Sequence, residues 1–76
     1  MSWFKRAPDE TITVHPSPST TANEAMTKMA LFSKLVTDHN LDLIDSGPAH
    51  ITLKGRPKNV ARFRAVHGVF HAQNLV

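Results

Sequence analysis

The 76-residue chain contains no cysteine and no tyrosine, and it has one tryptophan and three glycines. Without cysteine no disulfide can reinforce the fold, and thiolate metal sites are excluded. This composition fits a reducing compartment, so we expect a cytoplasmic protein. Gly47 and Gly55 stand alone in the sequence, which argues against a glycine-rich loop that cradles phosphate.

Long apolar runs are also absent. The longest is far shorter than the ~18 residues that a membrane-spanning helix needs. No apolar segment follows Lys5 and Arg6, so the start is not typical of a secretory signal, and we expect no membrane partner. A domain of this length buries only about 60% of the surface of its unfolded chain. Marginal stability follows, and a homodimer is one way to complete so small a core.

Acidic residues are missing from the second part of the chain. Residues 1–45 hold four Lys/Arg and six Asp/Glu, whereas residues 46–76 hold five Lys/Arg and no acid. The formal net charge is +3. The five C-terminal cations are Lys54, Arg56, Lys58, Arg62 and Arg64. With no carboxylate nearby in sequence, this cluster projects a positive field toward a polyanion.

The pattern of residues predicts a flexible tail over residues 1–10 and a single domain over residues 11–76. Residues 11–15 alternate polar and β-branched apolar side chains, as a half-buried strand does, and Pro16 ends the strand. Thr21 and Glu24 have the spacing of a capping box, so a helix should run from there to about His39. The predicted buried stripe of this helix is Ala22, Ala25, Met29, Phe32 and Val36, flanked by Met26 and Leu35.

The remaining residues predict a hairpin, a second helix and a last strand. Residues 41–44 and 49–54 form the hairpin around a turn at residues 45–48. The second of these strands alternates, with Ile51 and Leu53 on one face and His50, Thr52 and Lys54 on the other. Pro57 suits the first position of a helix. Gly68 costs about 1 kcal/mol inside a helix but is favoured just past its end, so we end this helix near His67 and predict a strand over residues 69–76. The alternative keeps residues 57–72 as one helix.

The resulting order is β-α-β-β-α-β. This predicts an α+β domain of the ferredoxin-like, split βαβ type, with both helices on one face of a four-stranded antiparallel sheet. The alternative helix gives the order βαββα with a longer C-terminal helix. A fold of this kind does not by itself identify the function of a protein.

Catalytic signals are weak. Ser17, Ser19 and Ser46 fall in predicted turns without a nucleophile elbow, so we expect no enzyme and no cofactor. His15, His50 and His71 could converge on neighbouring strands, as zinc ligands do. No motif supports such a site, and we therefore assign no metal and interpret them as surface histidines.

The cationic cluster is the best candidate binding site. Lys58 and Arg62 are four residues apart and share a helix face, while Arg64 lies on another part of the exposed surface. The predicted outer face of the sheet carries no aromatic residue, so base stacking is disfavoured and phosphate contacts without sequence preference are expected. The alternative interpretation is a solvated helix face.

Two functions follow from these observations. The first is a small, basic, non-enzymatic binding module whose polyanionic partner is nucleic acid or a nucleic-acid-processing protein. The second is a small regulatory or inhibitor protein, of the kind that viruses encode, that docks on a larger host enzyme by protein–protein contacts. An exposed edge strand or the Trp3–Phe4 pair would make those contacts.

Overall fold

A computed structural model describes residues 7–76 of the chain. Its elements, in order, are β1 (Glu10–Val14), α1 (Ala22–Asp38), β2 (Asp42–Ser46), β3 (Ile51–Gly55) and α2 (Pro57–Ala72). Two predictions, the contact role of Trp3 and Phe4 and most of the tail, concern residues 1–6, which lie outside the described residues.

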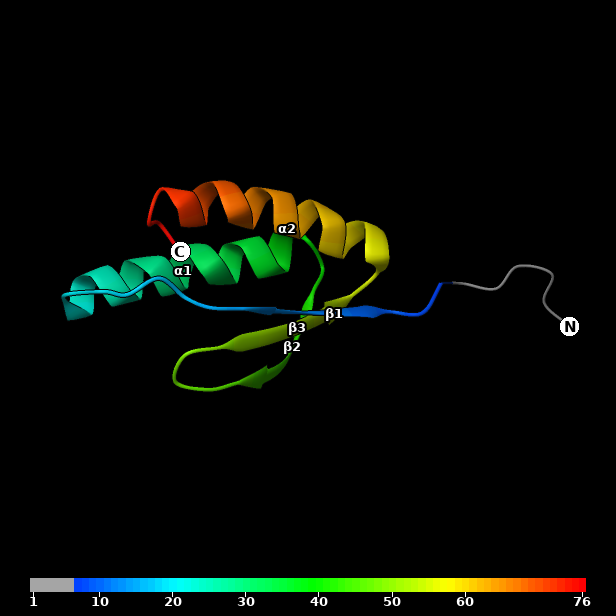
Figure 1. The fold of residues 1–76 in the computed structure, drawn as a ribbon, viewed down its shortest axis with the longest axis horizontal. Helices are drawn as coiled ribbons and strands as arrows, with labels where there is room; N and C mark the ends of the chain where they lie inside the picture. Colours follow the sequence, from blue (N-terminus) through cyan, green and yellow to red (C-terminus); the bar gives the residue numbers. More distant parts are fainter. Residues whose placement is uncertain (1–6) are drawn as a thin grey trace, which may run out of the picture.

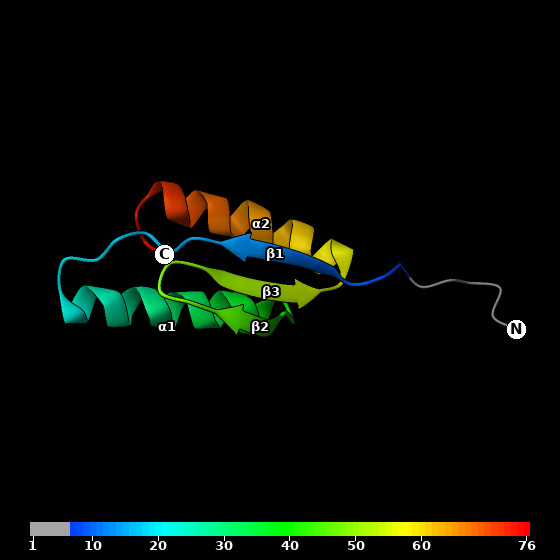
Figure 2. The same ribbon diagram turned by 60° about the horizontal axis from the view of Figure 1, so that its bottom comes forward.

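The three strands form one antiparallel sheet in the order β1-β3-β2. Figures 1 and 2 show that α1 and α2 cover the same face of this sheet, with β1 on the side of α2. The chain passes from β1 through α1 to β2, and β3 is then inserted between these two strands. The predicted α+β class and antiparallel sheet are therefore confirmed.

The predicted six-element fold is wrong in its last element. The helix does not end near His67, and residues 69–76 form no strand; α2 continues through Gly68 to Ala72, as the βαββα alternative states. Continuing the helix keeps His67 buried and packs Phe70 against the core. This burial outweighs the ~1 kcal/mol cost of a helical glycine. The chain then turns at Asn74, which has a φ of 61°, and brings Val76 into the core.

The core lies between the helices and β1 and β3. Phe63, Leu53 and Val60 are the largest fully buried side chains. In β3 the alternation is as predicted, because Leu53 is buried on the helix side while Thr52 pairs with Thr13 on the open face. Strand alternation therefore separates an apolar face under the helices from a polar face in solvent.

Helix α1 begins at the predicted cap, and Phe32 and Val36 of the predicted stripe pack against the core, but other residues of the stripe do not. The Thr21 hydroxyl accepts a hydrogen bond from the Glu24 amide at 3.1 Å. The Glu24 carboxylate accepts from the Thr20 hydroxyl at 2.8 Å instead of from the amide of Thr21. Leu35 is buried, whereas Met29, which we placed in the stripe, is 68% exposed. The stripe is thus rotated about the helix axis relative to the prediction.

Lys28 is buried in α1 and holds the connection from β1 to α1. Its ammonium donates to the Pro18 carbonyl at 2.7 Å and to the Ser17 hydroxyl at 2.9 Å, and it lies 3.3 Å from a Glu24 carboxylate oxygen. A buried ammonium with three oxygen partners is satisfied, so this lysine is structural.

Candidate functional site

The structure disperses the five predicted cations over three places. Lys58, Arg62 and Arg64 are exposed on α2, and within residues 7–76 none of them forms an ion pair. Lys58 and Arg62 lie one turn apart, and Arg64 lies on the flank of α2 that faces β1. We call these three side chains the α2 basic surface.

Arg56 is engaged by the chain itself. It precedes the first residue of α2, donates to the Ala7 carbonyl at 2.7 Å, and lies 3.6 Å from a carboxylate oxygen of Asp9. These contacts tie the segment before β1 to the start of α2. The positive charge of Arg56 is therefore partly neutralised by its own chain, unlike the charges of the α2 basic surface.

Lys54 lies on the open face of the sheet, away from α2. Its neighbours in register are Thr11 on β1 and Asp42 on β2. Asp42 therefore brings a negative charge to the same row of the sheet. This mixed charge separates Lys54 from the α2 basic surface.

The other carboxylates near the predicted site have partners elsewhere. Asp38 lies 2.7 Å from the Lys34 ammonium on the same helix, and Asp45 lies 3.0 Å from the His50 ring. Of the acids described by the structure, Asp9 is the one that pairs with a member of the predicted cluster. The α2 basic surface is thus left unmasked by carboxylates.

A groove between β1 and α2 was not predicted. It has a volume of about 540 Å³ and runs along β1 from Thr11 onward, leaving Glu10 outside its lining. Its lining is Thr11, Ile12, Thr13, Val14 and His15 from the strand side and Arg64, His67, Gly68 and His71 from α2. We call it the β1–α2 groove, and no residue of its lining is acidic.

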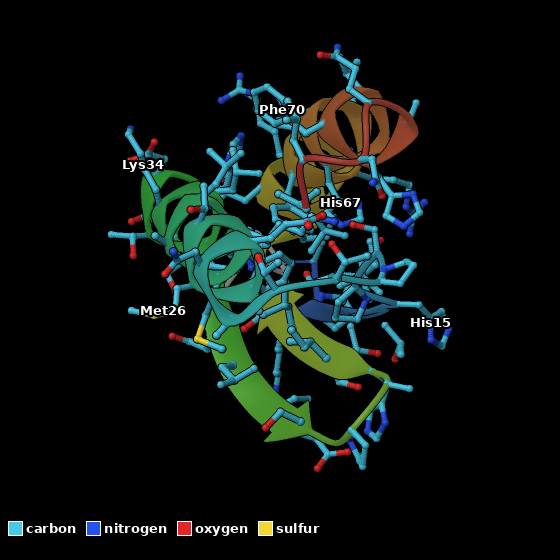
Figure 3. All side chains as sticks on the ribbon, turned by 90° about the vertical axis from the view of Figure 1, so that its left-hand side faces the viewer. His15, Met26, Lys34, His67 and Phe70 are labelled. Carbon is cyan, nitrogen blue, oxygen red and sulfur yellow. The ribbon has the colours of Figure 1, made fainter. Side chains whose placement is uncertain are left out.

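His67 lies in the wall of this groove and reaches into the core. It is 9% exposed, its ring stacks on Phe63 with 5.4 Å between centroids, and its Nε2 atom has no hydrogen-bond partner within the described residues. Burial, and next the charge of His71, hold the pKa of His67 below its ordinary value. The imidazole is therefore neutral at neutral pH. Figure 3 shows His67 pointing inward and His15 pointing outward.

The three histidines that could have met on the sheet have separate partners. His15 Nδ1 donates to the Ala49 carbonyl at 3.0 Å, and His71 Nε2 donates to the His15 carbonyl at 3.1 Å. His50 contacts Asp45 instead. Across residues 7–76 we find no group of three or more residues able to hold a metal ion.

Comparisons of this chain with protein-family models, with curated proteins and with solved structures find no match. Neither α1 nor α2 combines the length and the apolar character needed to cross a membrane. The functional argument therefore depends on the geometry of the chain itself.

One signal in the sequence could have revealed the groove. Arg64, Gly68 and His71 follow the spacing i, i+4, i+7, which places them along one flank of a continuous helix. We missed this flank because we ended the helix at His67. The participation of β1 could not be predicted, since it depends on the order of strands in the sheet.

Proposed function

We propose that this chain is a non-enzymatic binding module whose α2 basic surface engages a polyanion, namely nucleic acid or a protein that processes it. The observation that carries this proposal is the state of Lys58, Arg62 and Arg64, which are exposed and free of ion pairs within residues 7–76. The helix that carries them contains no Asp or Glu. A single-sign helix surface of this kind attracts phosphate groups over distances of about a Debye length, ~8–10 Å.

The mode of contact follows from the residue types. Arginine forks bind phosphate oxygens with two hydrogen bonds, and lysine binds them as a point charge. The start of α2 has no side-chain cap, so the positive end of its helix dipole adds to the same field. Phosphate contacts position a partner but do not read its bases, so we expect binding with little sequence preference.

Salt-dependent binding tests this proposal. Fluorescence anisotropy with a labelled DNA duplex should give a log–log salt slope of about −2.7 if three phosphates are contacted. Arg62→Gln or Lys58→Gln should each reduce the slope by about 0.9. Lys34→Gln removes the same charge from α1, where Lys34 already pairs with Asp38, and should leave the slope unchanged.

Two results would refute the proposal. One is undetectable binding to both duplex and single-stranded nucleic acid at low salt. The other is an equal loss of binding in Lys34→Gln and Arg62→Gln, because net charge alone would then explain the affinity.

Regulation or inhibition of a larger enzyme by protein contact is the second candidate function. The open edge of β1 beside α2 favours it, because within the described residues β3 is the strand neighbour of β1 and its other edge is unpaired. Capture from lysate with and without nuclease treatment separates the two candidates. A protein retained after nuclease treatment supports regulation, whereas a capture of nucleic acid that nuclease treatment abolishes, with no protein retained, supports the first proposal.

The cytoplasmic location and the homodimer stay predictions. The open face of the sheet offers threonines, such as Thr13 and Thr52, whose hydroxyls lie 3.0 Å apart. A polar face of this kind favours at most a weak dimer. Sedimentation velocity over a range of concentrations measures this directly.

A further inference from the structure

We propose that the β1–α2 groove binds an extended, acidic peptide segment of a partner protein, which pairs with the free edge of β1 as an added strand. This inference rests on the second candidate function, protein contact, and goes beyond it by naming the site and the chemistry of the ligand. It does not require that the chain bind nucleic acid.

The edge of β1 is available for pairing. In an antiparallel pair, alternate residues direct their amide and carbonyl groups away from the partner strand. In residues 7–76 the partner of β1 is β3, so the outward groups of β1 have no second strand to bind. The five residues of β1 pair with β3 without a register shift. A straight edge of this kind is a template for another strand.

β1 lacks several of the usual protections of an edge strand, and its one charged residue, Glu10, stands at its start. Natural edges are blunted by proline, by lysine or by a bulge. Residues Glu10–Val14 contain neither proline nor lysine, and their ladder has no bulge. β2, at the other edge, has a register shift between Leu43 and Asp45 and ends in polar residues. The contrast marks β1 as the edge suited to an incoming strand.

The groove leaves room for that strand between β1 and the helix. Gly68 lines the groove, and a side chain placed there would meet no atom of the protein within 4 Å. The helix therefore presents bare backbone at this point, and a peptide can approach it closely. Main-chain hydrogen bonds to β1 would supply affinity, and side chains directed toward α2 would supply specificity.

The charges of the groove select an acidic peptide. Arg64 lies in its wall, exposed and without an ion pair among residues 7–76, and no lining residue is acidic. A carboxylate on the peptide would complete a charge-assisted, two-pronged contact with this guanidinium.

A second copy of this chain fits the groove less well. Pairing two β1 edges about a two-fold axis would bring two grooves of the same sign together, each with its own Arg64. The formal net charge of +3 on each chain adds to this repulsion. We therefore commit to an acidic segment of a different protein.

Binding of designed peptides tests the proposal. The probe is an acetylated, fluorescein-labelled nonapeptide that alternates valine with glutamate and threonine, and its control carries lysine in place of glutamate. We expect the glutamate peptide to bind at least about tenfold more tightly than the lysine peptide. In ¹⁵N-HSQC spectra, addition of the glutamate peptide should shift the amides of β1 and of Gly68 and leave those of β2 in place.

Matched variants locate the contact. Gly68→Leu places a bulky side chain in the groove, at a position where an added Cβ meets no protein atom within 4 Å, and should abolish binding, while Ala65→Leu adds similar bulk at an exposed position outside the groove and should not. Arg64→Gln should weaken binding of the glutamate peptide about tenfold. Lys58→Gln with Arg62→Gln should leave it unchanged, so that loss of nucleic-acid binding and loss of peptide binding are distinguishable.

Several results would overturn the inference. Absence of binding at about 1 mM glutamate peptide, where even a weak contact is detectable, is one. Equal affinity for the lysine peptide, or unchanged binding by Gly68→Leu with its helical circular dichroism intact, is another. A peptide-free dimer whose interface shifts the same β1 amides would show that a second copy occupies the groove.

Discussion

The two edges of the sheet are built differently. The β1 edge is regular and lies beside α2, and its groove carries Arg64 and no acidic lining residue. The β2 edge is irregular and apolar, with Leu43 60% exposed and Ile44 51% exposed. Beside it, α1 leaves Met29 68% exposed in a cleft of about 630 Å³ between α1 and the β2–β3 hairpin. Figure 2 shows these two edges on opposite sides of the sheet.

The two edges therefore differ in how they are protected against pairing with another strand. At β2 the strand itself blunts its edge, by a bulge and by Asp42 and Asp45. At β1 the strand has no bulge, its one charged residue is Glu10, and within residues 7–76 its outer edge stays unpaired beside α2. The most deeply buried side chains of the two helices belong to α2, since Phe63 and Val60 are 0% and 1% exposed while Leu35 of α1 is 6% exposed. We expect the free energy of unfolding to be concentrated there.

Truncation of a core side chain of α2 should cause the largest loss of stability. Phe63→Ala removes a fully buried ring that also meets Phe32 edge to face, and it should cost about 3–5 kcal/mol. Leu43→Ala at the β2 edge, where the side chain is largely exposed, should cost less than about 1 kcal/mol. Urea unfolding followed by circular dichroism measures both values. Similar losses in the two variants would contradict the concentration of stability on the β1 side.

Acid should weaken the β1–α2 side through His67. Because the pKa of the folded ring lies below the ordinary value of 6.5, the unfolded chain takes up this proton first as the pH falls. The free energy of unfolding should therefore decrease below about pH 6.5, by at most ~1.4 kcal/mol per pH unit from this residue. His67→Phe keeps an aromatic ring against Phe63 and should flatten that part of the profile. An unchanged slope in this variant would show that His67 is not the source of the effect.

Loss of the cap should destabilise the α1 side by less. Thr21→Ala removes the oxygen that accepts from the Glu24 amide and should cost about 1 kcal/mol. Thr21→Ser keeps this acceptor and is the matched control. The Thr20 hydroxyl and amide, in that order, hold the pKa of Glu24 below 4.5, so this carboxylate contributes stability above that pH and loses it as the pH falls through its lowered pKa. Thermal unfolding of the three proteins at pH 7 compares them directly.

The smallest expected effect is a gain in stability. Gly68→Ala places a methyl group in open space on α2 and should stabilise the protein by about 0.5–1 kcal/mol. Gly47→Ala is the contrasting change, since its added methyl group would collide with the His50 ring. A loss of stability in Gly68→Ala would show that the helix is interrupted at this residue.

Local signals in the sequence predicted much of the fold. The Thr21–Glu24 pair located the start of α1 at residue 22, and Pro57 located the start of α2. Alternation over residues 50–54 identified β3 and its buried Leu53. Each of these signals acts between residues close in the chain, so no knowledge of tertiary contacts was needed.

The errors arose where tertiary burial competes with local preference. Gly68 favours the end of a helix, yet packing of Phe70 against the core continues α2 past it. Met29 has the spacing of a buried residue but is exposed, and the buried residues of α1 are Leu35 and Lys28. Spacing alone could not choose between neighbouring stripes of one helix, since the partner surface makes that choice.

The sequence by itself determined which segments form helices and strands over most of the chain, and that the C-terminal helix carries basic residues and no acid. Tertiary structure decided the strand order, the free edge of β1 and the pairing of Arg56 with Asp9. The physical reason is the separation, along the chain, of the residues that interact. Helix caps and strand alternation are set by neighbours in the chain, whereas strand order is set by joint burial of apolar side chains far apart in sequence.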